Sequence, residues 1–361
     1  MRRSRFVPAA VILALAALVG VGLWQTSRER ARRWVAVVRQ PDRVMGTTCT
    51  LAAVVADGEQ ARGEKVLREA EGALRAVEAR MSVWLADSEV SRLNAAAAGE
   101  EIPLSPDTLA VLCAARNAAT DTAGAFDITV GPLIELWKAA GQTDLAPARR
   151  ELEAARASSS WQLIELTDTG AVKRSPGARV DLGGIAKGYA VDQAIAMLES
   201  ADVRGGLVEV GGDLRCFGRR PDGESWPVDI KDPFAQGNLG AIRLREGAAC
   251  TSGNYARFVV IDGKRYSHIL DPRSGRPAEA VPSAVVVAPT AMGADIWATA
   301  LSVLGQDGLD RLPQGVEALV ILGSEEDRQF ICTPGLRPLL LVAESSQVEV
   351  WGERRGQGAA R

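Results

Sequence analysis

The 361-residue chain contains one histidine, His268, and the residues around it suggest acid–base chemistry. It lies in the segment RYSHILDPRSG, three residues before Asp271 and five before Arg273. The unperturbed pKa of imidazole, about 6.5, makes histidine a proton acceptor near neutral pH. A hydrogen-bonded hairpin histidine beside the turn at Asp271 and Pro272 explains the same residue equally well. With no partner histidine in the sequence, a zinc site is disfavoured.

Two further segments carry oxygen ligands and a phosphate-binding pattern. Asp295 and Thr299 stand four residues apart in ADIWATAL, which places them on one face of an expected helix. A carboxylate and a hydroxyl are hard ligands of the kind that Mg²⁺ accepts. In VDLGGIAKGYAVD, Asp181 is expected at a strand end and Lys187 in the first turn of the next helix. A glycine-relieved helix N-terminus suits a phosphate, although the spacing fits neither a P-loop nor a dinucleotide fingerprint.

Both segments also have purely structural interpretations. Asp295 could cap its helix while Thr299 bonds back to the preceding turn. The two glycines before Lys187 could serve only a tight strand-to-helix connection with an exposed lysine.

The elements that must position these residues predict an α+β fold. Apolar residues recur with helical spacing over residues 61–81, and a second helix is expected with Ser105 as N-cap and a stop near Gly124. A strand that ends near Asp181, followed by a turn with two glycines, is expected within 178–184, with helices at 185–200 and 291–305. The short strands between them include an Asp-Gly hairpin at 262–263. Runs of strands with interspersed helices favour α+β over a doubly wound sheet.

The amino-terminal 27 residues are expected to form an uncleaved signal anchor. The run from Phe6 to Ser27 carries no charge, is long enough to cross a bilayer and exceeds a typical signal-peptide core. It lacks a small-residue cleavage site, and the first cysteine, Cys49, is too distant for a lipoprotein. Arginines flank both ends, so the positive-inside rule leaves the orientation open. We expect a charged stem over 28–40, a catalytic domain over 41–344 and a flexible tail over 345–361.

Charge and cysteine content exclude other classes of protein. The net charge of −3 and the pI of about 5.6 provide no basic field for nucleic acid. The five cysteines are scattered and include no C-x-x-C pair, which disfavours a zinc site or a disulfide framework and leaves a single bridge possible.

Eight segments, taken in order, resemble the ApbE family of FAD:protein FMN transferases. They are MGTTCT, MSVWLADSEVSRLN, GAFDITVGPLIELW, VDLGGIAKGYAVD, EVGGDLRCFG, ACTSGNYARF, SHILDPRSGRP and ADIWATALSVLG, covering roughly residues 44–305. The resemblance implies an ApbE-like (T-fold-like) α+β fold of mixed sheets with packed helices. It also implies an enzyme that uses Mg²⁺ and FAD and attaches FMN through a phosphoester to a threonine, or sometimes a serine, of a partner flavoprotein, releasing AMP.

The resemblance also implies a periplasmic domain on the outer face of the bacterial inner membrane, which would settle the orientation. Family members are commonly lipoproteins, whereas this chain has no lipobox, so the helical anchor would replace the lipid. The acceptor implied is a subunit of a membrane redox complex.

Site residues carry over from the family motifs. The implied metal ligands are Asp295, Thr299 and the backbone carbonyl of Gly184, where a glycine replaces a small residue. The implied base is His268, with Arg273 as a phosphate neighbour. The implied FAD contacts are Met45, Trp84, Ala125, Phe126, Asp127, Asp181, Lys187 and Ile269. Trp84 stands where the family often has tyrosine, so stacking is kept and a hydroxyl is lost.

Two other functions use the same residues. In a Mg²⁺-dependent FAD pyrophosphatase, water would replace the acceptor hydroxyl and give FMN and AMP. A non-catalytic, membrane-tethered flavin carrier would show a degraded metal or base position, whereas Asp295, Thr299 and His268 are all present.

Overall fold

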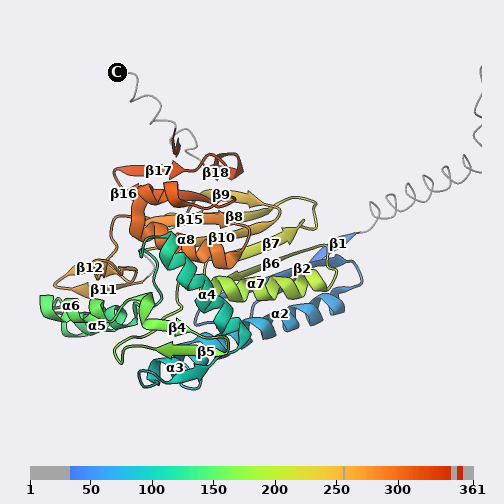
Figure 1. Ribbon diagram of the computed structural model, residues 1–361. Helices are drawn as coiled ribbons and strands as arrows, with labels where there is room; N and C mark the ends of the chain where they lie inside the picture. Colours follow the sequence, from blue (N-terminus) through green and yellow to red (C-terminus); the bar gives the residue numbers. More distant parts are fainter. Residues whose placement is uncertain (1–32, 255–256, 343–347, 353–361) are drawn as a thin grey trace, which may run out of the picture.

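The computed structural model describes residues 33–254, 257–342 and 348–352 (Figure 1). The expected anchor over 1–27, residues 28–32 of the stem and most of the tail lie outside these residues. Stem residues 34–39 and tail residues 348–350 form the two edge strands of the central sheet. Within them, no helix has the length and apolar character needed to cross a bilayer.

A nine-stranded sheet forms the centre of the domain, in the order β1-β2-β6-β7-β10-β15-β16-β17-β19. Its strands pair antiparallel except for the parallel pair β17–β19. The strands span β1 Trp34–Arg39, β2 Cys49–Ala56, β6 Gly205–Val210, β7 Asp213–Gly218, β10 Gly247–Gly253, β15 Ser283–Ala288, β16 Glu317–Gly323, β17 Arg328–Cys332 and β19 Val348–Val350. Many of their residues are valine, isoleucine or alanine buried on both faces, as expected for a sheet that is covered on each side.

Three helices cover one face of this sheet: α2 (Gln60–Met81), α7 (Ala186–Ser200) and α8 (Ala291–Leu304). In α2 the buried residues, among them Val66, Ala70 and Leu74, follow the helical period predicted from the sequence. The other face packs against a three-stranded sheet of β8 (Trp226–Lys231), β9 (Asn238–Leu244) and β18 (Leu340–Val342). The central sheet therefore has a core on each side.

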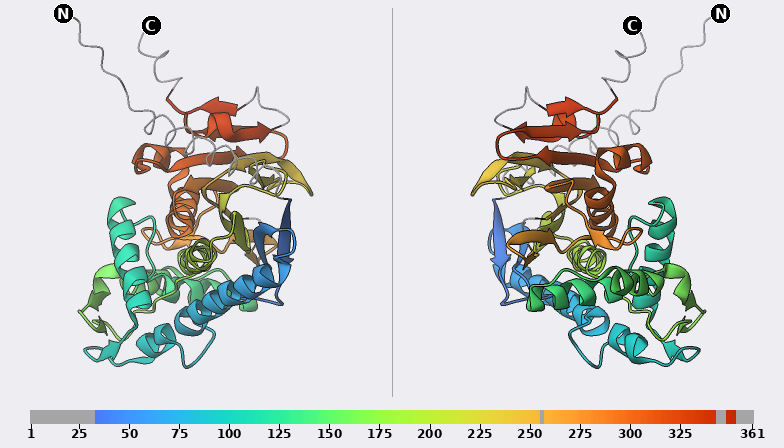
Figure 2. Two further views of the ribbon diagram at one scale, coloured as in Figure 1. Left: turned by 90° about the vertical axis from the view of Figure 1, so that its right-hand side faces the viewer. Right: turned by 90° about the vertical axis from the view of Figure 1, so that its left-hand side faces the viewer.

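The remaining elements extend from the helical side. A small sheet of β3 (Glu101–Pro103), β5 (Gly170–Lys173) and β4 (Ile164–Leu166) lies with α3 (Glu89–Ala95) and α4 (Pro106–Asp121). Helices α5 (Gly131–Thr143) and α6 (Arg149–Ala157) pack together, and α5 meets the hairpin of β11 (Phe258–Ile261) and β12 (Lys264–Ser267). The short pair β13 (Leu270–Asp271) and β14 (Arg276–Pro277) follows. Figure 2 shows the segments of residues 60–157 toward one end of the molecule and those of residues 317–342 at the other.

Several local predictions are confirmed. The Ser105 side chain caps α4 by accepting the backbone N–H of Thr108, and Gly124 follows the helix with a positive φ of 77°. Asp262 and Gly263 have φ values of 49° and 70° and form the predicted turn between β11 and β12. The mixed α+β class is also confirmed.

The strand predicted before the two glycines of residues 178–184 is wrong. This segment joins no sheet, because other partners satisfy its backbone. The Asn94 side chain donates to the Val180 carbonyl at 2.8 Å and accepts the Val180 N–H at 2.7 Å. The Asp181 N–H donates to the Ile128 carbonyl at 2.7 Å. Asp181 therefore lies in a loop fixed by side-chain and loop contacts.

Helices α7 and α8 approach so closely at Gly188 that we expect Gly188→Ala to lower the free energy of unfolding by about 1–3 kcal/mol. A Cβ there would lie 2.3 Å from the Ala291 carbonyl oxygen and 2.7 Å from Met292 Cα, backbone atoms that cannot rotate away. The matched control is Gly72→Ala in α2, where a Cβ meets no atom within 4 Å. The control is expected to stabilise by about 0.5–1 kcal/mol. Urea unfolding measures both, and an unchanged Gly188→Ala protein would contradict this packing.

Candidate active site

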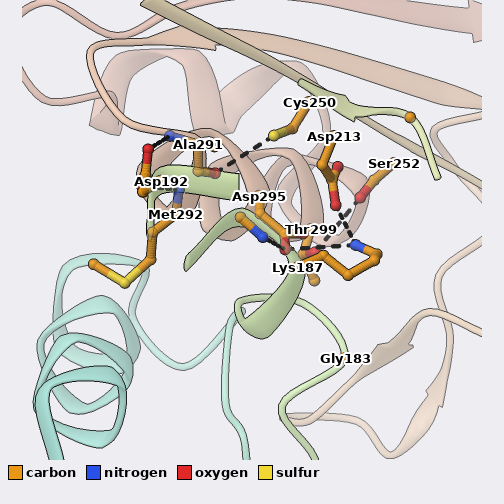
Figure 3. Close-up of polar contacts among 12 residues, drawn as sticks. Gly183, Lys187, Asp192, Asp213, Cys250, Ser252, Ala291, Met292, Asp295 and Thr299 are labelled. Atoms are coloured by element: carbon orange, nitrogen blue, oxygen red, sulfur yellow. Dashed lines mark hydrogen bonds and ion pairs between the residues drawn. The ribbon is translucent and has the colours of Figure 1, made fainter. Parts of the chain in front are cut away.

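The start of α7, the middle of α8 and the first residue of β7 bring three charged groups together (Figure 3). The Lys187 ammonium forms an ion pair with Asp213 Oδ2 and lies 3.5 Å from Asp295 Oδ2. The backbone N–H of Gly188 donates to the same Asp295 oxygen at 3.1 Å. Both carboxylates are buried, each in a residue only 2% exposed. The single ammonium of Lys187 thus lies between two carboxylates. When both carboxylates are ionised, the three groups together carry a net negative charge.

The electrostatics of this trio follow from its burial. Burial raises the pKa of Asp295, the Asp213 charge raises it further, and Lys187 and the Gly188 N–H offset part of that shift. Burial acts to lower the pKa of Lys187, but the charges of Asp213 and Asp295 outweigh it. The net pKa of Lys187 is raised, so its side chain stays protonated. The alternative of an exposed lysine after a tight connection is therefore wrong, since the Lys187 side chain is 25% exposed and paired.

Thr299 and Gly184 complete the group of predicted metal ligands. A Cβ on Gly184 would lie 2.9 Å from Thr299 Oγ1 and 3.2 Å from Phe126 Cε2, so the side chains of Thr299 and Phe126 both pack against Gly184. The Ser252 hydroxyl, on β10, lies 3.5 Å from Thr299 Oγ1. The structure thus brings Asp295, Thr299 and Gly184 to one place. Thr290, not Asp295, caps α8, so the capping role considered for Asp295 is wrong.

The donor set at this place consists of carboxylate, hydroxyl and carbonyl oxygens, which fits Mg²⁺ and does not fit zinc. In the part of the chain that the structure covers, no three or more His, Cys, Asp or Glu side chains are grouped as a metal site. A cation here would therefore depend on the Thr299 hydroxyl and a backbone carbonyl besides Asp295.

The remaining residues predicted to contact the flavin differ in their burial and in the hydrogen bonds that they already make within the protein. Phe126 is buried beside Gly184, and Ala125 and Ile269 are also buried. The Asp127 carboxylate accepts three hydrogen bonds within the protein, from the N–H and hydroxyl of Thr129 and from the N–H of Trp161, which hold it in place.

Met45, Asp181 and Trp84 lie on loops. Met45 has a positive φ of 52° in a tight turn closed by hydrogen bonds between Val44 and Thr47. Asp181 Oδ1 accepts the N–H of Gly183 at 2.8 Å, which shapes the turn before α7. Trp84 is 80% exposed in the connection between α2 and α3, with Lys138 Nζ of α5 lying 4.7 Å from its ring centre. Its open ring face is a surface on which a flat aromatic system could stack.

His268 directly follows β12, and its Nδ1 lies 2.9 Å from the Arg257 carbonyl oxygen. A carbonyl only accepts, so Nδ1 donates and the neutral ring keeps its lone pair on Nε2. Partial desolvation and the charges of Arg257 and Lys187 lower the pKa of His268, although the bond to the Arg257 carbonyl opposes this. The ring is therefore neutral at neutral pH, as a proton acceptor must be.

Arg273, the predicted phosphate neighbour, is held by Asp271. Its Nε and a terminal nitrogen lie 2.8 and 3.2 Å from the two Asp271 oxygens. A Cβ on Gly124 would lie 3.7 Å from Arg273 Cγ, so the side chain runs beside the loop that carries Phe126. Its guanidinium is partly exposed and already carries a carboxylate partner.

The sequence reasoning missed Asp213, Ser252 and Asp192, all of which contact this site or the helices that carry it. The signal for Asp213 was a carboxylate directly after two glycines at the start of a strand, in EVGGDLRCFG. All five cysteines are free, so the single bridge left possible is absent.

Comparisons with known proteins agree with this geometry. The model of the ApbE family matches residues 45–320. A FAD:protein FMN transferase of Rhodobacter capsulatus is 35% identical over 264 residues, 72% of this chain, and the match spans 50% of that longer protein. One from Vibrio cholerae is 35% identical over 303 residues, 82% of this chain and 90% of that protein.

The fold agrees as well. The solved structure of the flavin transferase ApbE from Vibrio cholerae superposes with a TM-score of 0.76 at 31% identity, covering 86% of this chain and 100% of that one. The resemblance read from the eight motifs is therefore confirmed, and the chain belongs to the ApbE family.

Proposed function

We propose that this protein transfers the FMN part of FAD to a threonine or serine hydroxyl of a partner flavoprotein. The hydroxyl oxygen attacks the FMN-side phosphorus, a phosphoester bond forms, the bond to the bridging oxygen breaks, and AMP leaves with that oxygen. The observation that carries this proposal is the buried cluster of Lys187, Asp213, Asp295 and Thr299 around Gly184 at the start of α7. Relatives named as FAD:protein FMN transferases support it.

The residues of the cluster have distinct parts in this reaction. Asp295, Thr299 and the Gly184 carbonyl would hold Mg²⁺, which would supply charge neutralisation at the pyrophosphate. Lys187 adds a fixed positive charge beside them. His268 Nε2 accepts the proton of the attacking hydroxyl, while the Nδ1 bond to the Arg257 carbonyl keeps the ring oriented.

The test is incubation of the full-length chain in detergent with FAD, Mg²⁺ and candidate acceptors, followed by intact-mass analysis. The acceptor is expected to gain the mass of one FMN as AMP appears. Release of FMN and AMP with no mass gain on any acceptor would favour the pyrophosphatase. FAD binding without AMP release would favour the flavin carrier.

We also propose that the domain faces the periplasm, tethered to the bacterial inner membrane by residues 6–27. The uncharged length of that segment supports this location, and an acceptor in a membrane redox complex would lie within reach. Full-length chain is expected in the membrane fraction after carbonate extraction. Recovery of a soluble form that starts near residue 27 would point to a cleaved signal peptide instead.

A further inference from the structure

Helix α8, which carries Asp295 and Thr299, is held at its first residues by a carboxylate from another helix. Asp192 of α7 accepts the N–H of Ala291 on Oδ1 and the N–H of Met292 on Oδ2, each at 2.9 Å (Figure 3). These are the first two N–H groups of α8, which have no partner within the helix. The first turn of α8 contains no acidic residue, so the charge that complements its N-terminus comes from α7.

The same carboxylate is tied to the central sheet. Arg215 Nη1 donates to Asp192 Oδ1 at 2.9 Å, and Arg215 lies on β7, two residues after Asp213. The Asp192 side chain is only 13% exposed. Asp192 therefore joins α7, α8 and β7, the three elements that supply Lys187, Asp295 and Asp213.

The contact surface between α7 and α8 leaves little freedom for this arrangement. Gly188 lies against the Ala291 backbone, and its N–H reaches Asp295 one turn further along α8. Asp192 is four residues after Gly188 and so lies on the same face of α7. The two contacts together fix the position of α8 along and across α7.

We propose that Asp192 is a positioning residue for the cation site, setting α8 so that Asp295 and Thr299 face Gly184 and Lys187. This inference rests on the proposed function. Mg²⁺ requires ligands at about 2.0–2.1 Å in a near-octahedral arrangement, so a small displacement of α8 weakens binding. An ordinary helix cap, by contrast, stabilises the helix without changing the affinity of a site one or two turns away.

The test compares Asp192→Asn with Thr290→Ala. Asparagine presents an amide N–H₂ where the carboxylate accepted, so it loses one helix bond and the charge that pairs with Arg215. Thr290→Ala removes the cap within α8, a bond from the Gly293 N–H to Thr290 Oγ1 at 3.2 Å, and leaves the link to α7 intact. Binding of Mn²⁺ alone to the full-length chain is measured by the EPR signal of the free ion, without turnover.

We expect Asp192→Asn to weaken Mn²⁺ binding about tenfold or more, the usual effect of losing a group that orients metal ligands. Thr290→Ala is expected to change the Mn²⁺ affinity by less than about twofold, although its thermal midpoint falls about as far as that of Asp192→Asn. Wild-type affinity in Asp192→Asn, or an equal loss in both variants, overturns the positioning role. Asp295→Ala serves as the reference: if it also binds Mn²⁺ like the wild type, the cation site of the proposed function fails as well.

Hydrogen exchange on the wild-type chain decides the question where Asp192→Asn does not fold. If Asp192 couples α8 to the cation site, linkage requires that the bound cation in turn stabilises the hydrogen bonds between Asp192 and the first two N–H groups of α8. The amides of Ala291 and Met292 are expected to exchange several-fold more slowly with saturating Mg²⁺ than without it. Equal exchange rates in the two conditions overturn the proposal.

Discussion

Asp295→Ala is expected to lower flavin transfer by about 10³-fold or more, because a bound cation contributes several kcal/mol of transition-state stabilisation. Asp295 is the only charged side chain among the proposed ligands, and Thr299 and the Gly184 carbonyl cannot replace its charge. The measurement is the initial rate of FMN attachment to the acceptor at saturating FAD and Mg²⁺. Full activity in this variant after chelator treatment and addition of Mg²⁺ would remove the cation site from the mechanism.

The folding of this variant provides its control. The pKa of Asp295 is raised in the folded state, so the stability that its protonated form contributes is lost as the pH rises through that raised pKa. Removing the carboxylate removes this unfavourable charge above neutral pH but also takes the acceptor from the Gly188 N–H, so only a small change in the stability of the metal-free protein is expected. A large drop in the thermal midpoint of Asp295→Ala at pH 8 would show a structural role for the carboxylate instead.

His268→Ala is expected to lower transfer by about 10²–10⁴-fold, the usual contribution of a positioned base, while FAD still binds. His268→Asn is the sharper variant, because its side-chain amide can still donate to the Arg257 carbonyl while the Nε2 acceptor is gone. Both variants are expected to lose activity to a similar degree in the transfer assay. Retention of activity in His268→Asn would make the bond to Arg257 the essential feature of this residue.

The pH profile of the wild-type enzyme gives an independent reading of the same group. The base works when deprotonated, and its pKa is lowered, so the rate is expected to rise with pH through one group just below the ordinary histidine range. The His268 variants should lose this ascending limb. A limb that persists in His268→Asn would assign it to another group.

Residues that share one helix could be predicted from the sequence. Asp295 and Thr299 are four apart in a continuous helix, so local periodicity alone placed them on one face. The caps and the Asp-Gly turn were predictable for the same reason, because their geometry depends on neighbours within a few residues. The family motifs then indicated that Gly184 belongs beside them.

Contacts between elements distant in the chain could not be predicted in this way. Asp213 contacts Lys187 because β7, in the middle of the central sheet, lies beneath α7. The order of strands in the sheet decides this contact, and no local sequence pattern specifies that order. The same limit explains the strand wrongly expected over 178–184, whose backbone partner is the side chain of Asn94, far earlier in the chain. It also explains why the hydrogen bond from the Trp161 N–H to the Asp127 carboxylate was not predicted.

The strand order of the central sheet determines when during synthesis the protein can become active. Strand β2 pairs with β6, so Leu51 has no strand partner until Val208 has been synthesised and has reached the compartment in which the domain folds. The site needs Lys187, Asp213 and Thr299 together, and the last of these lies near the end of the sheet-forming sequence. Such distant pairing makes folding slow and leaves strand edges open meanwhile. A nascent chain that stops short of α8 therefore has no working site, and FAD can meet a complete one only after almost the whole domain has been made.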